Sequence, residues 1–409
     1  MHRPGKIGHA LGINRTVLSL SLARMADGIG NSILFVMIPL YVGQVPDKLI
    51  PLPRVLLIGV LISIYGLSNA LLQPFMAALS DRIGHYKRII QAGLLVIALS
   101  TVGFIFADRY VDLFGLRVVQ GWGLAMEIPP TLALLGLVTD RETRGGAMGF
   151  FTTLRMSGLA IGPLLGGYLY DAYGINAAFY AGTAILLAAL LVVEFWVEDH
   201  DAPDQTDKRC AAIFDASILN PGILSASLAT FLMASAFSLV TTLENRFNAR
   251  LDMQALGFGI AFSSLMVGRL VFQVPMGRLS DRFGRKPFVL GGLILIAPAT
   301  MFLGDVTSLA QFSLLRFIQG IAAAAIVAPA LAYAGDVAQN ETECRRSRQM
   351  SLVTIGFGLG IAFGPLMAGI LAVYSFRLPF FVDGLLCLFG AVIVHFFMKE
   401  ARGPDPNQA

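Results

Sequence analysis

The chain has 409 residues, of which 56% are hydrophobic and only 14% are charged, whereas a soluble domain carries about 25% charged residues. This composition excludes an ordinary soluble protein, and a net charge of +4 in so apolar a chain does not indicate a nucleic-acid-binding surface. The hydrophobic residues come in runs of about 20, which predict an integral membrane protein built from transmembrane helices.

The predicted elements are twelve membrane-spanning helices. The first continues past Ile38 without a small-residue cleavage site, so we interpret it as a span rather than a signal peptide. In chain order the predicted spans are residues 17–43, 53–79, 88–107, 111–138, 146–170, 175–197, 218–243, 254–279, 287–304, 308–335, 348–374 and 377–398. The longest polar break, 198–217, separates residues 1–197 from residues 218–409. We therefore predict an all-α membrane fold of two six-helix bundles joined by a linker.

Lys and Arg residues are divided unequally between the two sides of the predicted spans. Of the 30, 19 lie at the termini and in the alternate loops that include the central break, six lie in the opposite loops, and five lie within spans. Because positively charged loops remain in the cytoplasm, we expect both termini and the linker to be cytoplasmic. The expected location is the cell membrane, specifically the inner membrane of a bacterium.

Three short motifs recur in both halves in the same order. Asp81 is repeated as Asp281, R-V-V-Q-G of 117–121 as R-F-I-Q-G of 316–320, and Gly162-Pro163 as Gly364-Pro365. The offsets of 200, 199 and 202 residues indicate a duplicated unit of six spans. An even number of spans places both copies the same way up in the membrane, and repeats of this kind hold their site between the halves near the middle of the bilayer.

The repeated loop resembles a signature of the major facilitator superfamily, G-x-x-x-D-R-x-G-R-[KR]. The second copy contains the whole pattern: Gly277, Asp281, Arg282, Gly284, Arg285 and Lys286. The first copy retains Asp81, Arg82 and Gly84, but Ala77 replaces the leading glycine and His85-Tyr86 replace the Arg-Lys pair.

Predicted span 5 resembles the antiporter motif of the same superfamily, G-x8-G-x3-G-P-x2-G-G. The matching residues are Gly149, Gly158, Gly162, Pro163, Gly166 and Gly167. This second resemblance implies a twelve-span, proton-coupled exporter of hydrophobic or amphipathic drug-like molecules. Two alternatives stay open: an exporter or flippase of a lipid, siderophore or metabolite, and a proton-coupled uptake carrier.

An enzyme is not expected, since the sequence contains no Walker loop, zinc-binding helix or nucleophile elbow. We therefore predict no catalytic residues, no metal ligands and no cofactor other than the proton as coupling ion. The expected partners are a small-molecule substrate, protons and the lipid bilayer, without nucleic acid, and the expected functional state is a monomer.

The repeated loops lie at predicted cytoplasmic helix ends, where an aspartate can accept from free helix N–H groups and a base can meet an acid. Asp140 and Asp336, at matched positions ending spans 4 and 10, are candidate partners. We expect a cytoplasmic latch that opens during transport, with the first copy the weaker one. The alternative is plain positive charge that only sets the orientation.

Glycines of span 5 recur every four residues at Gly158, Gly162 and Gly166, so they share one helix face. Small residues allow transmembrane backbones to approach closely, and Pro163 removes a backbone hydrogen bond. We interpret this face as a seam between the halves that flexes during alternation. Ordinary packing of small residues is the alternative.

Charged residues inside the spans are costly and indicate function. Asp27, Glu127 and Arg155 lie at similar predicted depths, and Arg24 and Asn31 share a helix face with Asp27. The position that matches Glu127 in the second half is Ile326, and no histidine lies deep in a span. We therefore expect Asp27, Glu127 or both to carry the coupling proton, with a static Asp27–Arg155 ion pair as the alternative.

Arg117 belongs to the R-x-x-Q-G pattern, which by resemblance assists proton movement or binds an anion, although its twin Arg316 favours an architectural role. Asp383 and Arg269 are expected to be structural. In the fold that the resemblance implies, the residues expected to line the substrate cavity are Asn31, Phe35, Tyr65, Asn69, Gln73, Trp122, Met126, Phe231 and Phe237. The alternative is that these residues do not line a cavity and simply face lipid or another helix. The charge of the substrate stays open.

Overall fold

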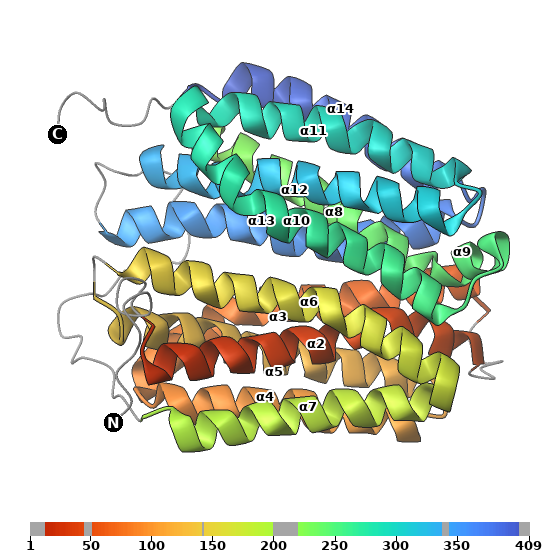
Figure 1. The fold of residues 1–409 in the computed structure, drawn as a ribbon, viewed down its shortest axis with the longest axis horizontal. Coiled ribbons are helices and arrows are strands. Elements are labelled where there is room, and N and C mark those ends of the chain that lie inside the picture. The colour runs from red at the N-terminus through yellow and green to blue at the C-terminus, as the bar shows by residue number, and fades with distance from the viewer. Residues whose placement is uncertain (1–12, 45–50, 141–142, 199–219, 338–342, 401–409) are drawn as a thin grey trace. The chain divides into compact units, whose positions relative to one another are not determined.

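The computed structural model describes residues 13–44, 51–140, 143–198, 220–337 and 343–400, without the side chains of 81 and 343–348. Long α-helices make up nearly all of the described chain, and no strand occurs in it (Figure 1). The all-α class predicted from the sequence is therefore correct for this part of the molecule.

The helix bounds follow the predicted spans to within five residues. The first six described helices are α2 (Arg15–Gln44), α3 (Arg54–Ile83), α4 (Tyr86–Gly103), α5 (Tyr110–Leu137), α6 (Arg144–Tyr173) and α7 (Ile175–Trp196). The others are α8 (Pro221–Thr242), α9 (Glu244–Leu251), α10 (Ala255–Phe283), α11 (Arg285–Phe302), α12 (Leu309–Val337), α13 (Glu343–Leu371) and α14 (Leu378–Phe397). Short 3-10 turns, η1 (Phe104–Phe106) and η3 (Leu303–Asp305), extend α4 and α11.

Ten of the described helices are long and apolar enough to cross a membrane. The two other long helices, α5 and α6, have 28 and 30 residues. At 1.5 Å per residue they are long enough to cross the hydrocarbon core of a bilayer. Both carry charged residues inside the helix, Arg117 and Glu127 in α5 and Arg155 in α6. The protein is thus a multi-pass membrane protein, while the count of twelve spans and the cytoplasmic termini stay predictions.

Contacts group the helices into two compact units. Unit 1 consists of Met1–Pro51, Ile64–Thr206 and Gln254–Ser263, and unit 2 of Leu52–Ser63, Asp207–Met253 and Ser264–Ala409. The start of α3 therefore belongs to unit 2 and the start of α10 to unit 1. The predicted limits at residues 197 and 218 stay a prediction, and nearly all of the linker 198–217 lies outside the described residues.

In unit 1, α6 lies directly on α2. A Cβ atom at Gly158 would meet the carbonyl oxygen of Met25, and one at Gly162 would lie 2.6 Å from that of Ile29, closer than real Cβ atoms approach. The predicted shared face of glycines therefore packs on the first helix of its own half. The interpretation of this face as a seam between the halves is wrong.

The other antiporter-motif glycines are in different surroundings. A Cβ atom at Gly166 would lie 3.2 Å from the Ile33 side chain, and one at Gly167 would lie 2.7 Å from the Cα atom of Leu256 at the start of α10. A Cβ atom at Gly149 would meet no described atom within 4 Å. Only part of the motif is therefore required by close packing.

Unit 2 repeats the α2–α6 contact with α8 and α13. Cβ atoms at Gly360 and Gly364 would meet the carbonyl oxygens of Phe231 and Ser235 on α8. Gly360 corresponds to Gly158 and Gly364 to Gly162, at an offset of 202 residues. Backbone packing therefore repeats along with the sequence, and it gives a register for comparing the two halves.

The short helix α9 is not among the predicted spans. It ends at Asp252, whose φ of 47° is left-handed. Phe247 anchors it, with its ring stacked at 4.3 Å on Phe312 and edge-on to Phe376 and Phe380. A polar segment is thus helical because one aromatic side chain is fully buried.

Candidate functional site

Three polar side chains of α2 lie buried on one face. Arg24 is 3% exposed, Asp27 2% and Asn31 7%. Arg24 Nη1 donates to Asp27 Oδ2 at 2.7 Å, and Asn31 Nδ2 donates to Asp27 Oδ1. The spacing of three and four residues brings these side chains together over successive turns of one helix.

Glu127 of α5 joins this cluster through Arg24. The same Arg24 Nη1 lies 3.2 Å from Glu127 Oε1. The other carboxylate oxygen, Oε2, is buried and has no hydrogen-bond partner among the described residues. One guanidinium therefore bridges carboxylates on two helices, and α2 and α5 otherwise touch at few positions.

Tyr65 of α3 extends the cluster toward Arg117. Its hydroxyl donates to Asn31 Oδ1 at 2.8 Å, and the Arg117 guanidinium lies 5.3 Å from the centre of the Tyr65 ring. Arg117 also donates to Gln120 Oε1 at 2.8 Å. We call the connected set Arg24, Asp27, Asn31, Tyr65, Arg117 and Glu127 the polar cluster.

Arg155 of α6 is half-buried and acts electrostatically on both Asp27 and Glu127. The ion pair that the structure shows for Asp27 is nevertheless made by Arg24. Arg24 and Arg155 stand opposite two carboxylates, and these four charges balance when all are ionised, while Arg117 adds a further positive charge beyond Tyr65. Binding of one proton would leave one positive charge in excess among these four groups.

Arg24 is the member of the polar cluster that sequence reasoning missed as a site residue. Its position three residues before Asp27 was visible, and a buried base within one turn of a buried acid predicts an ion pair. Depth counting favoured Arg155 instead, because it ignores the length and direction of the arginine side chain, which spans about a helical turn.

Arg117 has a structural twin in unit 2. Arg316 donates to Gln319 Oε1 at 2.9 Å, and its guanidinium lies 5.7 Å from the Phe237 ring. The arrangement of arginine, glutamine and aromatic ring is thus common to both halves. The acids are not, since Ile326 stands in place of Glu127.

The predicted cavity residues are in unequal positions. Phe35 is buried, stacked at 6.1 Å on Phe262 and edge-on to Tyr65, so it adjoins the polar cluster as Asn31 and Tyr65 do. The half-buried ones are Asn69, Gln73, Met126 and Phe231, while Phe237 is buried beneath Arg316. Trp122 is 44% exposed and is not brought into the cluster.

In the second loop motif, Arg285 is the central residue. It pairs with Asp281 and, at 3.1 Å, with Asp336 Oδ2, and it donates to Ser280 Oγ at 2.9 Å. Gly284 has a φ of 98°, which a residue with a Cβ atom rarely adopts. Arg282 is exposed.

The first loop motif shares the glycine but not the arginine. Gly84 has a φ of 78°, and His85 occupies the place of Arg285. Arg82 and Asp140 are exposed, and the Asp81 side chain lies outside the described part of the chain. The second copy therefore shows a formed ion-pair network, while the first copy cannot be compared at Asp81, whose side chain is outside the described residues.

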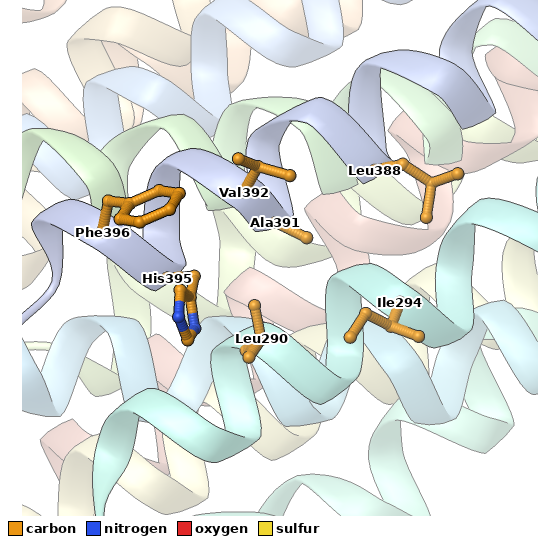
Figure 2. Close-up of a pocket in the computed structure, with 7 residues that line it drawn as sticks. All are labelled: Leu290, Ile294, Leu388, Ala391, Val392, His395 and Phe396. Carbon is orange, nitrogen blue, oxygen red and sulfur yellow. The ribbon is translucent and has the colours of Figure 1, made fainter.

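An apolar pocket of about 370 Å³ lies between α11 and α14 (Figure 2). Its lining residues are Leu290, Ile294, Leu388, Ala391, Val392, His395 and Phe396. None of them belongs to the polar cluster, so we assign the pocket no role in this site. Within the described ranges, no group of three or more His, Cys, Asp or Glu side chains could hold a metal ion.

Comparisons with known proteins agree with this architecture. A family model described as Major Facilitator Superfamily matches residues 20–251 and 222–409. The multidrug resistance protein MdtG of Serratia proteamaculans is 30% identical over 342 residues, covering 82% of each chain. The uncharacterized MFS-type transporter YuxJ of Bacillus subtilis is 28% identical over 351 residues, covering 83% of this chain and 88% of that one. The crystal structure of a D-xylose–proton symporter matches with a TM-score of 0.78 at 14% identity, covering 95% of this chain and 99% of that one, a likeness of fold alone.

Proposed function

The chain belongs to the Major Facilitator Superfamily, and on this premise we propose that it is a proton-coupled exporter of hydrophobic or amphipathic small molecules in a bacterial inner membrane. It is a multi-pass transporter by its family and its apolar helices. The proposal concerns the coupling ion, the direction of transport and the class of substrate.

The observation that carries the proton coupling is the bridge from Arg24 to Asp27 and Glu127. A proton that binds the free Oε2 of Glu127 removes the charge that attracts Arg24 Nη1. Arg24 then remains held by Asp27 alone, and the link between α2 and α5 weakens. Release of the proton restores the link, so protonation is tied to the contact between two helices.

The export direction and the substrate class are supported by the relatives and by the aromatic side chains. MdtG of Serratia proteamaculans carries the name of a multidrug resistance protein. Phe35, Tyr65 and Phe262 form a continuous aromatic group beside the polar cluster, and such surfaces suit varied apolar ligands. The D-xylose–proton symporter shares the fold, so uptake is the direction that the experiment must exclude.

The test is dye loss from preloaded cells that produce the protein, with and without a proton-collapsing ionophore. We expect faster loss than from cells that do not produce the protein, and the ionophore should abolish the difference. Equal loss with and without the ionophore would contradict proton coupling. Greater dye accumulation in energised cells would support the uptake carrier. Unchanged dye content would favour a lipid, siderophore or metabolite as cargo.

A further inference from the structure

Arg269 of α10 is a buried cation for which the described residues supply no acidic partner. Its side chain is 7% exposed, and its guanidinium lies 5.7 Å from the centre of the Phe357 ring on α13. Nε has no hydrogen-bond partner, and among the described residues no carboxylate lies within ion-pair distance of this arginine. Both residues belong to unit 2.

The other buried arginines each make at least one hydrogen bond or ion pair through the guanidinium. Arg24 pairs with two carboxylates, while Arg117 and Arg316 each donate to a glutamine three residues further on. An arginine stays charged in proteins, and a buried charge without a counter-charge is costly, above all in a membrane. Arg117 also keeps Nε and Nη2 without a hydrogen bond, but Arg269 is the buried arginine for which the described residues supply neither a hydrogen bond nor an ion pair. Its charge is therefore available to a partner from outside the chain.

The described acids of unit 2 do not supply that partner. Asp383 is fully buried and accepts from Ser235 Oγ at 2.6 Å, and the groups that act on it do not include Arg269. Asp336 is held by Arg285. Gly158 meets Met25 and Gly360 meets Phe231, so Phe231 corresponds to Met25 in the repeat. Met233 therefore matches Asp27, and Ile326 matches Glu127.

The repeat register adds a second observation. Arg269 corresponds to Asn69, and Phe357 corresponds to Arg155. The correspondence also holds in space. A Cβ atom at Gly121 would lie 3.2 Å from the backbone nitrogen of Asn69, and a Cβ atom at Gly320 would lie 2.9 Å from the backbone nitrogen of Arg269. In unit 1 the position of Phe357 is thus taken by an arginine with acids nearby, whereas in unit 2 the arginine stands on α10 and the acids are replaced by Met233 and Ile326.

We propose that Arg269 binds an anionic group of the transported molecule, a carboxylate or a sulfonate, with Phe357 holding the guanidinium plane. The cargo class is then an amphipathic organic anion or zwitterion. An arginine suits this task because its planar fork can donate two parallel hydrogen bonds to such a group. The inference rests on the proposed function, because it names the cargo of that exporter.

Two fluorescent dyes test it, carboxyfluorescein as an organic anion and ethidium as a cation. Proton-driven uptake of each into inside-out vesicles is measured for the wild type, Arg269→Gln, Arg269→Lys and Arg377→Gln. We expect the wild type to transport carboxyfluorescein, Arg269→Gln to raise its KM about tenfold or more, and Arg269→Lys to restore part of the loss. Arg377→Gln removes an equal charge from an exposed ion pair with Asp305 and should leave the KM unchanged.

The outcomes separate the two proposals. Proton-driven transport of neither dye by the wild type would overturn the proposed function and this inference with it. Transport of ethidium alone, or an equal carboxyfluorescein KM for wild type and Arg269→Gln, would overturn the inference alone. Since Arg269→Gln could simply fail to fold, its thermal unfolding midpoint in detergent is compared with that of the wild type. If the midpoint of Arg269→Gln falls, the carboxyfluorescein KM of a folded Arg269→Lys is compared with that of the wild type instead. A KM that is unchanged in both variants overturns the inference.

Discussion

Arg24 joins two acids that the sequence separates by 100 residues, and this makes it the residue on which the first-half site depends. Its guanidinium neutralises carboxylates on α2 and α5 at once. Removing one partner of a buried ion pair costs more than the pair itself contributes, because the remaining charge stays buried. The cost at Arg24 is increased because two acids are left rather than one.

Arg24→Gln should therefore destabilise the protein by about 3–5 kcal/mol, seen as a large drop of the thermal unfolding midpoint in detergent. The double variant Arg24→Gln/Glu127→Gln should recover part of that loss, because one orphaned charge is removed. Arg316→Gln is a control at another buried arginine, in the other half: it breaks hydrogen bonds but orphans no acid, and should cost about 1–2 kcal/mol. An equal or smaller loss for Arg24→Gln than for Arg316→Gln would contradict the bridging role.

The buried acids and the shared face of Arg24, Asp27 and Asn31 could be predicted from the sequence, because helical spacing fixes which residues are neighbours on one helix. The choice of Arg24 as the bridge could not, because it depends on how α5 lies against α2. Trp122 shows the same limit, since its 44% exposure follows from the rotation of α5 about its axis, which hydropathy does not determine.

Helix packing in unit 1 depends on glycines that let α6 touch α2 through backbone atoms. Gly162 faces the Ile29 carbonyl and Ser32, and Gly364 repeats the contact with Ser235 in unit 2. Without a hydrophobic driving force between helices in lipid, such close approach is a main source of association. A single methyl group at these positions must displace a helix.

Gly162→Ala should lower the folded yield and the thermal unfolding midpoint markedly, by the equivalent of about 1–3 kcal/mol of overpacking. Gly149→Ala lies in the same motif on the same helix but meets open space, and should leave both quantities within experimental error. Size-exclusion chromatography and thermal unfolding in detergent measure the difference. If the two alanine variants behave alike, the contact between α2 and α6 is not close-packed.

At this scale the sequence predicted the long helices well, because runs of apolar residues and polar breaks are strong local signals. It did not predict α9, since that helix depends on the burial of Phe247 against rings from α12 and α14. The sequence also did not show that the glycine face of α6 packs on α2 rather than on a helix of the other half. A glycine face indicates that some helix lies close, and the identity of that helix is a tertiary property.

Across the whole molecule, two copies of the loop motif have diverged. The second holds Arg285 between Asp281 and Asp336, whereas His85 occupies the matched place in the first. Both copies keep the glycine with positive φ that ends α3 or α10. The shape of the turn has therefore been retained in both, and the ion-pair network is formed in the second.

Asp281→Asn should reduce the initial rate of proton-driven transport at least as much as Asp81→Asn does, because it removes a partner from the formed network. Rates are compared in inside-out vesicles that contain equal amounts of each variant. The opposite order would mean that the first copy is the one that controls opening.

The claim that Asp27 and Glu127 couple transport to protons is tested most directly in liposomes reconstituted with the purified protein. For each of Asp27→Asn and Glu127→Gln, dye accumulation driven by an imposed proton gradient is compared with dye exchange at equilibrium. We predict that at least one variant loses gradient-driven accumulation while it retains exchange. Full accumulation by both variants would contradict proton coupling through these two acids.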